Sequence, residues 1–332
     1  MARDESITQL ITQSPRRPIL THLNADTSWL ISFPQPCKHN TEKTTRSYYH
    51  VLVDPWLDGD LIVQYRWILI LQHSIKASFQ TIQDVRDLIR DMERAAGTLA
   101  DGDNGEVDSV LITHYLDDHC HKASLLQIDA AVPIVTVGKG ACMVESWGHF
   151  TSVETMPDLD LAAPQTLWQS DRDYAVTCLP SFLRVGRLPS GPPFPELHWA
   201  TLIAFSTDGT ALKAGTQMVP ETIFYSPHGI YAERVQDTSF ATEHSRVLAL
   251  LHGLDPAFSP QAANLGIENG EKLAKKLGVK YWVPTHDEHL SYGGVIGWFQ
   301  SKYKKEWAEM VAGDSEEMVR REIENGESFV LV

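Results

Sequence analysis

The pattern of apolar positions divides the chain into short strands and a few amphipathic helices. Runs rich in β-branched and aromatic residues are typical of strands, and they lie at residues 27–33, 48–53, 109–113, 134–137, 175–179, 199–205, 222–225, 246–251, 281–283 and 328–332. Apolar residues three and four positions apart predict helices instead, at residues 83–96, 268–277, 295–312 and 316–324. Strands dominate the first two thirds, and helices alternate with strands in the last third. We therefore expect an α/β protein with sheets packed between helices, in a single domain over residues 1–332, with residues 1–20 as an N-terminal extension.

Two of the predicted helices carry clear boundary signals. Thr81 and Asp84 form a start signal before the apolar face of the helix at 83–96. Gly278 directly follows the helix at 268–277, and a glycine there is a common helix terminator.

The composition is that of an ordinary globular protein with an acidic balance. Hydrophobic residues make up 43% and charged residues 21% of the 332 residues, and 28 Lys+Arg stand against 43 Asp+Glu, a formal net charge of −15. Such a charge argues against binding to nucleic acid and against docking on an anionic membrane surface. We expect a small-molecule substrate rather than a macromolecular partner, and the sequence leaves the oligomeric state open.

Neither the N-terminus nor the apolar stretches predict secretion or a membrane span. Residues 1–13 mix charged with apolar residues and lack the apolar run of a signal peptide. The most apolar stretch, residues 61–71, is interrupted by Gln64 and Arg66 and is too short to cross a bilayer. Four cysteines without a C-x-x-C pair are too sparse for a disulfide scaffold. We therefore expect a reduced, cytoplasmic protein.

The densest cluster of reactive side chains is the segment 114–121, which reads HYLDDHCH. It follows the strand at 109–113, so its side chains emerge at the carboxyl end of a strand, where sites of α/β proteins commonly form. Imidazole and carboxylate together are ligands that zinc and iron accept. The alternative is a helix N-cap at Asp117 or Asp118 with surface histidines, but a cap accounts for one aspartate and not for three histidines.

The spacing of this cluster resembles that of a known superfamily. His114, Asp118 and His119 form H-x-x-x-D-H, which resembles the H-x-H-x-D-H signature of the metallo-β-lactamase-fold superfamily. Residues 27–31 look like the first hairpin of that fold, 51–56 like its strand ending in Asp-Pro, and 283–286 like its late strand ending in a histidine. The D-D-H-C-H at 117–121 and the P-H-x-x-Y at 227–231 are similar to a poorly characterised branch of hydrolases of uncertain substrate. The resemblance covers roughly residues 24–297 and implies a four-layer αββα sandwich.

The resemblance also implies a metal site at the strand ends, with three departures from the signature. Leu116 stands where the second histidine is expected and cannot bind a metal. Cys178 stands nearest to the next expected histidine, either as a thiolate ligand or as a core residue. His228 stands where a bridging acid is usual. We therefore predict one divalent ion rather than two, zinc before iron or manganese, held by Asp118, His119 and His286 with assistance from His228 and, as a weaker candidate, His114.

Further side chains are expected around this ion, and two of the ligands are expected to take part in the reaction. Asp118 would orient the attacking water and His228 would act as a ligand or general acid, so these two are the predicted catalytic residues. Residues expected to support ligands or to contact substrate are Asp54, Asp117, His121, Asp287 and Tyr231. For each of these, and for His228 and His286, a turn, surface or packing role is the alternative.

The function that this pattern favours is metal-dependent hydrolysis of an acyl bond in a small molecule: an ester, thioester, lactone or amide. A metal lowers the pKa of its bound water and polarises a carbonyl oxygen. Phosphodiesters are less favoured because few Lys and Arg residues surround the motifs. The rival hypothesis is a degenerate site without a hydrolytic metal, in a binding module or in a metal-free acid–base enzyme acting on a biosynthetic intermediate.

Overall fold

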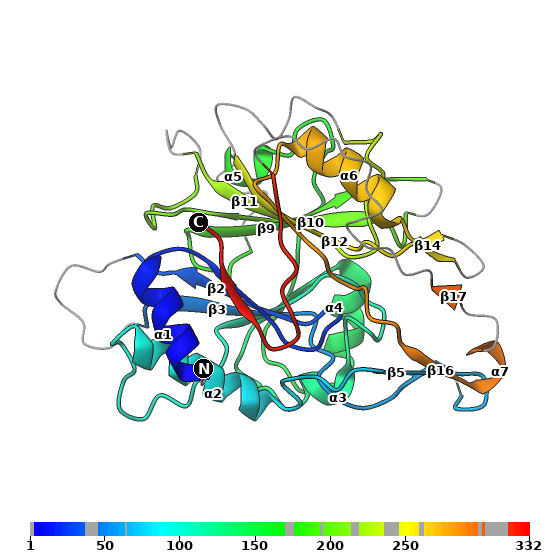
Figure 1. The fold of residues 1–332 in the computed structure, drawn as a ribbon, viewed down its shortest axis with the longest axis horizontal. Helices are drawn as coiled ribbons and strands as arrows, with labels where there is room; N and C mark the ends of the chain where they lie inside the picture. The colour runs from blue at the N-terminus through cyan, green and yellow to red at the C-terminus, as the bar shows by residue number, and fades with distance from the viewer. Residues whose placement is uncertain are drawn as a thin grey trace.

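Two large sheets lie face to face in the computed structural model, which describes residues 3–36, 46–63, 65–169, 176–192, 195–213, 219–235, 246–258, 262–297, 301–302 and 318–332 (Figure 1). The strands of the first sheet are β1 (Ile19–His22), β2 (Trp29–Pro34), β3 (Tyr48–Val53), β6 (Ser109–Ile112), β7 (Ile134–Thr136), β8 (Val153–Thr155) and β19 (Ser328–Val330). Their order is β19-β1-β2-β3-β6-β7-β8. The pairs from β3 to β8 are parallel, and the remaining pairs are antiparallel.

The second sheet combines an antiparallel half with a parallel half. Its strands are β9 (Leu183–Pro189), β10 (Trp199–Phe205), β11 (Glu221–Ser226), β12 (Arg246–His252), β15 (Tyr281–Val283) and β18 (Val319–Arg320). Their order is β18-β15-β12-β11-β10-β9. The pairs β11–β12, β12–β15 and β15–β18 are parallel. The carboxyl ends of β11, β12 and β15 therefore lie side by side, and the segments that follow them all leave the sheet at that end.

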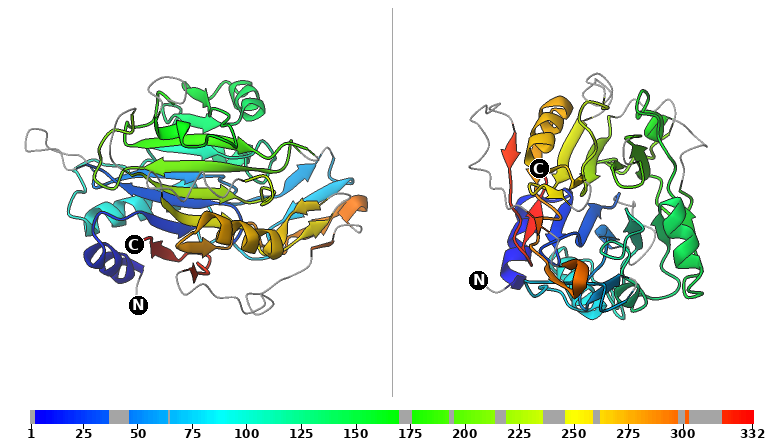
Figure 2. Two further views of the ribbon diagram at one scale, coloured as in Figure 1. Left: turned by 90° about the horizontal axis from the view of Figure 1, so that it is seen from above. Right: turned by 90° about the vertical axis from the view of Figure 1, so that its right-hand side faces the viewer.

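Helices cover the outer face of each sheet (Figures 1 and 2). The first sheet is covered by α1 (Arg3–Gln13), α2 (Ile82–Ala95), α3 (Lys122–Leu125) and α4 (Gly138–Glu145), and the second by α5 (Thr166–Gln169) and α6 (Gly266–Leu277). Three apolar clusters hold the layers together, one between the sheets and one under each helix layer. Continuous burial of strands such as β2 and β10 reflects this covering on both faces. The predicted αββα sandwich is confirmed.

Two small three-stranded sheets lie at one end of the sandwich, at the right of Figure 1. One contains β4 (Leu61–Val63), β5 (Leu69–Gln72) and β16 (Ser291–Gly293), which runs into the short helix α7 (Gly294–Gly297). The other contains β13 (Ala257–Phe258), β14 (Ala262–Asn264) and β17 (Ser301–Lys302). The left view of Figure 2 shows both at the same end of the molecule.

The elements with clear sequence signals form as predicted. Every expected strand except the one at 175–179 is present, and the helices at 83–96 and 268–277 correspond to α2 and α6. Thr81 and Asp84 form a reciprocal capping box at the start of α2, and α6 ends at Gly278 in the left-handed conformation. The segment 1–20, expected as an extension, contributes α1, whose Ile7 and Ile11 are buried in the same apolar cluster as the α2 side chains.

The strand prediction at 175–179 is wrong for the described residues 176–179, which form a turn. The Leu179 amide donates to the Val176 carbonyl, and Glu154 accepts hydrogen bonds from the amide and hydroxyl of Thr177. Next to this turn, β9 pairs with β10 along its whole length. Its sequence, LRVGRLP, gave no strand signal because charged residues and a glycine interrupt the apolar positions.

The helix prediction at 316–324 is also wrong within the described residues, because 318–324 contain no helix and include β18. Val319 pairs in parallel with Tyr281, so tertiary pairing along the edge of the second sheet overrides the local preference. Of the helix predicted at 295–312, α7 covers only the start, and Ser301–Lys302 is a strand. The rest of that prediction lies outside the described residues. No described helix is long and apolar enough to span a membrane.

Candidate metal centre

Three histidines from distant parts of the chain converge at the carboxyl ends of the strands. His119 lies in the turn between β6 and α3, His228 follows β11, and His286 follows β15. One ring nitrogen of each lies within 4.8 Å of the others, and all three side chains are buried. The Nε2 atoms of His119 and His228 are 3.0 Å apart. Imidazole nitrogens that share a tetrahedral ion at about 2.0–2.1 Å lie roughly 3.3 Å from each other, so this donor set fits one ion.

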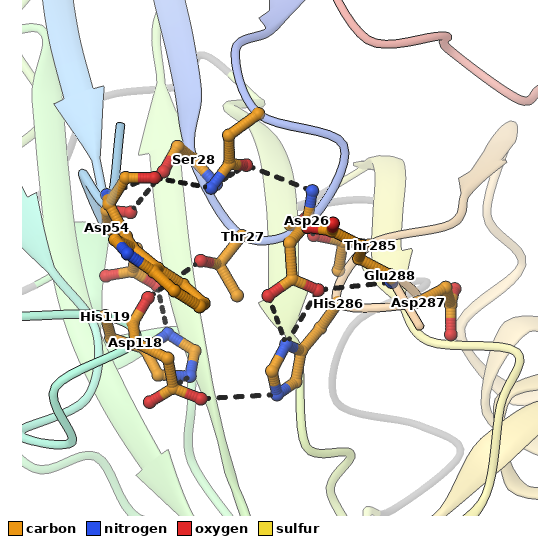
Figure 3. Close-up of polar contacts among 12 residues, drawn as sticks. Asp26, Thr27, Ser28, Asp54, Asp118, His119, Thr285, His286, Asp287 and Glu288 are labelled. Atoms are coloured by element: carbon orange, nitrogen blue, oxygen red, sulfur yellow. Dashed lines mark hydrogen bonds and ion pairs between the residues drawn. The ribbon is translucent and has the colours of Figure 1, made fainter. Parts of the chain in front are cut away.

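Each of the three rings is fixed from behind through its Nδ1 atom. A hydrogen bond from Nδ1 to a buried side chain sets the tautomer and leaves Nε2 as the metal-binding atom. The three pairs are His119 with Asp54 at 2.7 Å, His228 with Asn264 Oδ1 at 2.8 Å, and His286 with both oxygens of Asp26 at 3.1 Å. Figure 3 shows Asp54 behind His119 and Asp26 behind His286.

Asp54 is positioned by the pairing of β3 with β6. It directly follows β3, has a φ of 45°, and accepts hydrogen bonds from the amide and the hydroxyl of Thr113 at 2.7 and 2.6 Å. Positive φ is unusual for a residue with a Cβ and costs free energy. The surrounding hydrogen bonds offset that cost and aim the remaining carboxylate lone pairs at His119. Asp54 therefore holds the Nδ1 of His119, the candidate ligand.

Asp26 comes from the turn between β1 and β2 and joins the first sheet to the segment after β15. It is fully buried. Its carbonyl accepts the amide of His286 at 3.0 Å, and its carboxylate accepts the amide of Glu288 at 3.3 Å. His286 itself has a φ of 62°. These contacts hold an otherwise unfavourable backbone conformation and point the His286 ring toward His119.

Asp118 approaches the cluster from its more exposed side. Its carboxylate oxygens lie 3.8 Å from His286 Nε2 and 4.0 Å from His119 Nε2 (Figure 3). The Asp118 side chain is 15% exposed, against 9% for His286 and 0% for His119. Asp118 is therefore the acidic group placed to meet an ion, a water molecule or a substrate entering the site.

The carboxylates make the cluster receptive to positive charge. Burial alone would lower the pKa of His119, but Asp118 and Asp54 outweigh burial and raise that pKa to about 9. Burial and the neighbouring rings of His286 and His114 hold the pKa of His228 well below its usual range. Protonated His119 can therefore donate its Nε2 proton to neutral His228. A divalent cation would replace that proton between the same two nitrogens.

His114, predicted as a weaker ligand candidate, lies beside the cluster but is not one of its converging residues. Its ring centroid is 5.4 Å from that of His119 and 5.0 Å from that of His228. Its Nδ1 accepts the Leu116 amide at 3.2 Å, and its ring stacks on Trp199 at 4.3 Å. The structure therefore brings three of the five predicted ligands together, places the Asp118 carboxylate near two of them, and leaves His114 as a neighbour.

Asp54 is one of five residues predicted to support ligands or to contact substrate. The other four, Asp117, His121, Asp287 and Tyr231, make no described hydrogen bond to a ring of the cluster. Asp117 is exposed, and burial of part of its carboxyl together with Asp118 raises its pKa. His121 pairs with the Ser124 hydroxyl, and Asp287 accepts the amides of Leu254 and Asp255. The remaining member, Tyr231, packs its ring 5.0 Å from His198.

Cys178 takes the core role that was one of its two alternatives. Its side chain packs against the cluster between the two sheets, and burial raises the pKa of its thiol to about 12. The thiol is not among the metal-binding atoms that converge in the described part of the chain. Among the described residues, the candidate ligands are therefore histidines and a carboxylate.

Two residues of the site, Asp26 and Asn264, could not be found from the sequence. Neither lies in a motif, and each is remote in sequence from the histidine that it holds. Asn264 lies in β14 and Asp26 in a polar turn. A histidine that binds a metal usually donates its other ring nitrogen to an acceptor, so the sequence predicts that such acceptors exist. It does not predict which residues they are.

Comparisons with known proteins establish the fold and go no further. No family model and no curated protein matches the sequence. Among solved structures, a possible metal-dependent hydrolase from Veillonella parvula DSM 2008 superposes with a TM-score of 0.51 at 11% identity, covering 95% of this chain and 100% of that chain. An isothiocyanate hydrolase from Delia radicum gut bacteria superposes with a TM-score of 0.54 at 14% identity, covering 94% and 99%. The chain thus shares its whole fold with these proteins at low sequence identity.

Proposed function

We propose that this protein is a metal-dependent hydrolase that uses one divalent ion to cleave an acyl bond of a small molecule. The observation that carries the proposal is the convergence of three buried histidines, each fixed through Nδ1 by its own hydrogen-bond acceptor. Fixing the tautomer of every ring in this way is typical of metal sites. The two superposed proteins, a possible metal-dependent hydrolase and an isothiocyanate hydrolase, support the same class.

His119, His228 and His286 would hold the ion, and Asp118 would complete the ligand set. The ion would supply a Lewis acid that polarises a carbonyl oxygen and makes water nucleophilic near neutral pH. The carboxylate of Asp118 is within reach of both His119 and His286, so it can accept a hydrogen bond from the attacking water and orient it. The buried partners Asp54 and Asp26 keep the rings in place throughout.

We further propose that the ion is zinc and that only one is bound, with iron or manganese as alternatives. Nitrogen and oxygen ligands suit all three metals. Three histidines give the protein-ligand count of a single catalytic site, which keeps a further position open for water, and an ion that also binds Asp118 would need five-coordination to keep that place. Leu116 has no metal-binding atom, and His114 and Cys178 do not converge with the other ligands, so the described residues offer no evident second ligand set.

The substrate that this site favours is neutral and has an electrophilic carbon. Asp26, Asp54 and Asp118 lie around the histidines, and the whole chain carries a formal charge of −15. Such a field disfavours a polyanion. Esters, thioesters, lactones and amides meet this requirement. An isothiocyanate also does, which makes it a sensible additional probe given the superposed isothiocyanate hydrolase.

The first test is the metal content of protein purified without chelator or metal-affinity resin, measured by plasma mass spectrometry. We expect about one zinc, iron or manganese per chain, and its loss in an Asp118→Ala/His119→Ala double variant. His289→Ala is the matched control, because His289 lies three residues after His286 but pairs with Asp255 outside the cluster. Absence of metal from the folded wild-type protein, even after addition of zinc, would contradict the proposal and favour metal-free chemistry.

The second test is turnover of a panel containing a neutral ester, a thioester, a lactone, an amide and an isothiocyanate. Activity should disappear on removal of the metal with EDTA and return on addition of zinc. Unchanged turnover in EDTA would show that the reaction does not use the metal. Turnover of the isothiocyanate alone would keep the metal-dependent hydrolase and overturn the acyl preference.

A further inference from the structure

The three histidines of the candidate metal centre do not have equivalent partners. His119 and His286 donate to the carboxylates of Asp54 and Asp26, whereas His228 donates to the amide oxygen of Asn264 at 2.8 Å. A carboxylate behind an imidazole makes the ring a stronger donor to a metal. An amide oxygen accepts the same hydrogen bond without a full negative charge.

The contact between Asn264 and His228 belongs to a clamp that fixes the whole segment around this ligand. The Leu265 amide donates to the His228 carbonyl at 3.1 Å, so adjacent residues hold both the ring and the backbone. Gly229 has a φ of +86°, and a Cβ there would lie 2.9 Å from the Leu265 Cβ. Asn264 is 3% exposed. Hydrogen bonds to the ring and to the backbone, together with close packing, therefore fix His228 in place.

We propose that Asn264 is a positioning residue that makes His228 the most weakly bound and most readily exchanged ligand of the metal ion. This inference rests on the proposed metal-dependent function. His119 and His286, each supported by a buried carboxylate, hold the ion firmly. His228, aimed equally well but supported by a neutral group, is the ligand whose bond to the ion is most easily lengthened or given up.

A change from amide to carboxylate at this position separates an electrostatic role from a packing role. Asn264→Asp keeps the size and the acceptor oxygen but adds the negative charge that the other two histidines have behind them. We expect the variant to bind Zn²⁺ about tenfold more tightly than the wild type. Asn264→Leu removes the acceptor, and we expect it to bind Zn²⁺ about 10–100-fold more weakly.

The measurement is competition for Zn²⁺ against a chelating indicator, together with the visible absorption spectrum of the Co²⁺-loaded proteins. Asn269→Leu is the matched control. Asn269 also supports this segment, through the Ile230 carbonyl and the Ala232 amide, but the ring it contacts is that of His252, outside the cluster. We expect this control to keep the wild-type affinity and spectrum, whereas Asn264→Leu should change the Co²⁺ spectrum because a ligand is displaced.

The outcomes separate this inference from the function on which it rests. Tighter binding by Asn264→Asp and weaker binding by Asn264→Leu support it. Equal or weaker binding by Asn264→Asp, with the wild type binding one ion, overturns the inference and leaves the proposed function standing. A wild-type protein that binds no Zn²⁺ or Co²⁺ overturns both. Asn264→Asp keeps the test decisive even if Asn264→Leu fails to fold, because its side chain occupies the same volume.

Discussion

At the scale of single residues, the protein uses buried carboxylates chiefly to fix histidine rings. Asp54 with His119, Asp26 with His286, and Glu93 with His50 are all buried pairs. A buried carboxylate is costly unless it is paired and hydrogen-bonded. Two of these pairs lie in the candidate metal centre and the third lies away from it, so the chain offers a natural comparison between a ligand-supporting pair and a purely structural one.

Replacing Asp54 should weaken metal binding without unfolding the protein. Asp54→Asn keeps an oxygen that can accept from Thr113 but removes the charge behind His119. We expect Zn²⁺ affinity to fall about 10–100-fold, measured by competition with a chelating indicator. Glu93→Gln is the control, since it removes charge from a buried pair with a different histidine. Equal affinities in both variants and the wild type would show that Asp54 does not support a ligand.

Replacing Glu93 should instead affect stability, and in a pH-dependent way. Burial would raise the pKa of Glu93, but hydrogen bonds from His50 and Thr98 hold it below the usual 4.5. A carboxyl whose pKa is lower in the folded state stabilises that state above its unfolded pKa and loses this effect as the pH falls through its folded pKa. Glu93→Gln should therefore cost about 3 kcal/mol of unfolding free energy at pH 7.

The pH dependence provides the check. In urea unfolding, the difference between wild type and Glu93→Gln should persist down to about pH 4.5 and shrink at lower pH. A difference of constant size from pH 7 to pH 3 would indicate that shape, and not the ionised carboxylate, is what the fold requires at this position.

Single residues also mark the limit of what the sequence could predict about the site. His119 and Asp118 lie together in one segment after an apolar strand, so local pattern was sufficient to find them, whereas His228 and His286 were found through the resemblance of their strand-end motifs to a known signature. Asp26 and Asn264 act through contacts with residues that are remote in sequence. His114 satisfied the motif and its ring lies beside the cluster, but its nitrogens are not among the metal-binding atoms that converge in the described residues. Such contacts depend on how the layers meet, and one sequence does not show that.

At the scale of elements, two turns contain a glycine with a left-handed backbone conformation. One turn only ends a helix, whereas the other positions a candidate metal ligand. Gly229 follows His228 with a φ of +86°, and a Cβ there would lie 3.0 Å from His252 Nε2 as well as close to Leu265. Gly278 ends α6 with a φ of 59°. A Cβ is disfavoured at both positions, at a cost of about 1–2 kcal/mol, but only the first position is adjacent to a metal-ligand candidate.

We expect Gly278→Ala to lower the unfolding free energy by about 1 kcal/mol and to leave Zn²⁺ affinity unchanged. Gly229→Ala should lower both, because relief of the close contacts must shift the His228 backbone. Thermal unfolding and metal competition on the two variants measure these effects. Unaltered Zn²⁺ affinity in Gly229→Ala, with the expected loss of stability, would mean that His228 tolerates movement or does not bind the ion.

The accuracy of the element predictions follows the strength of the local signals. Strands buried on both faces, such as β10, and helices with a capping box or a terminal glycine, such as α2 and α6, were predictable because propensity and pattern agree. β9 and β18 were not, because each is a strand mainly through pairing with a neighbour, β10 or β15. The small sheets at the end of the sandwich have strands too short for a periodic signal.

At the scale of the whole molecule, the candidate metal centre connects both layers of the sandwich. His119 follows a strand of the first sheet, and His228 and His286 follow strands of the second. Asp26, from the first sheet, holds His286 of the second. An ion bound by all three histidines would therefore link the two sheets directly, and it would bind the folded state far better than the unfolded chain.

Metal removal should consequently lower the stability of the entire fold. A ligand at about 100 times its dissociation constant adds about 2.7 kcal/mol. A domain of 332 residues shifts its melting temperature by roughly 1–2 °C for each kcal/mol, so we expect EDTA to lower the Tm by about 3–5 °C and zinc to restore it. The Asp118→Ala/His119→Ala double variant should melt at one temperature with or without EDTA. A wild-type Tm that does not respond to chelator or zinc would mean that no ion connects the two sheets, and the three converging histidines would then have to be explained by their hydrogen bonds alone.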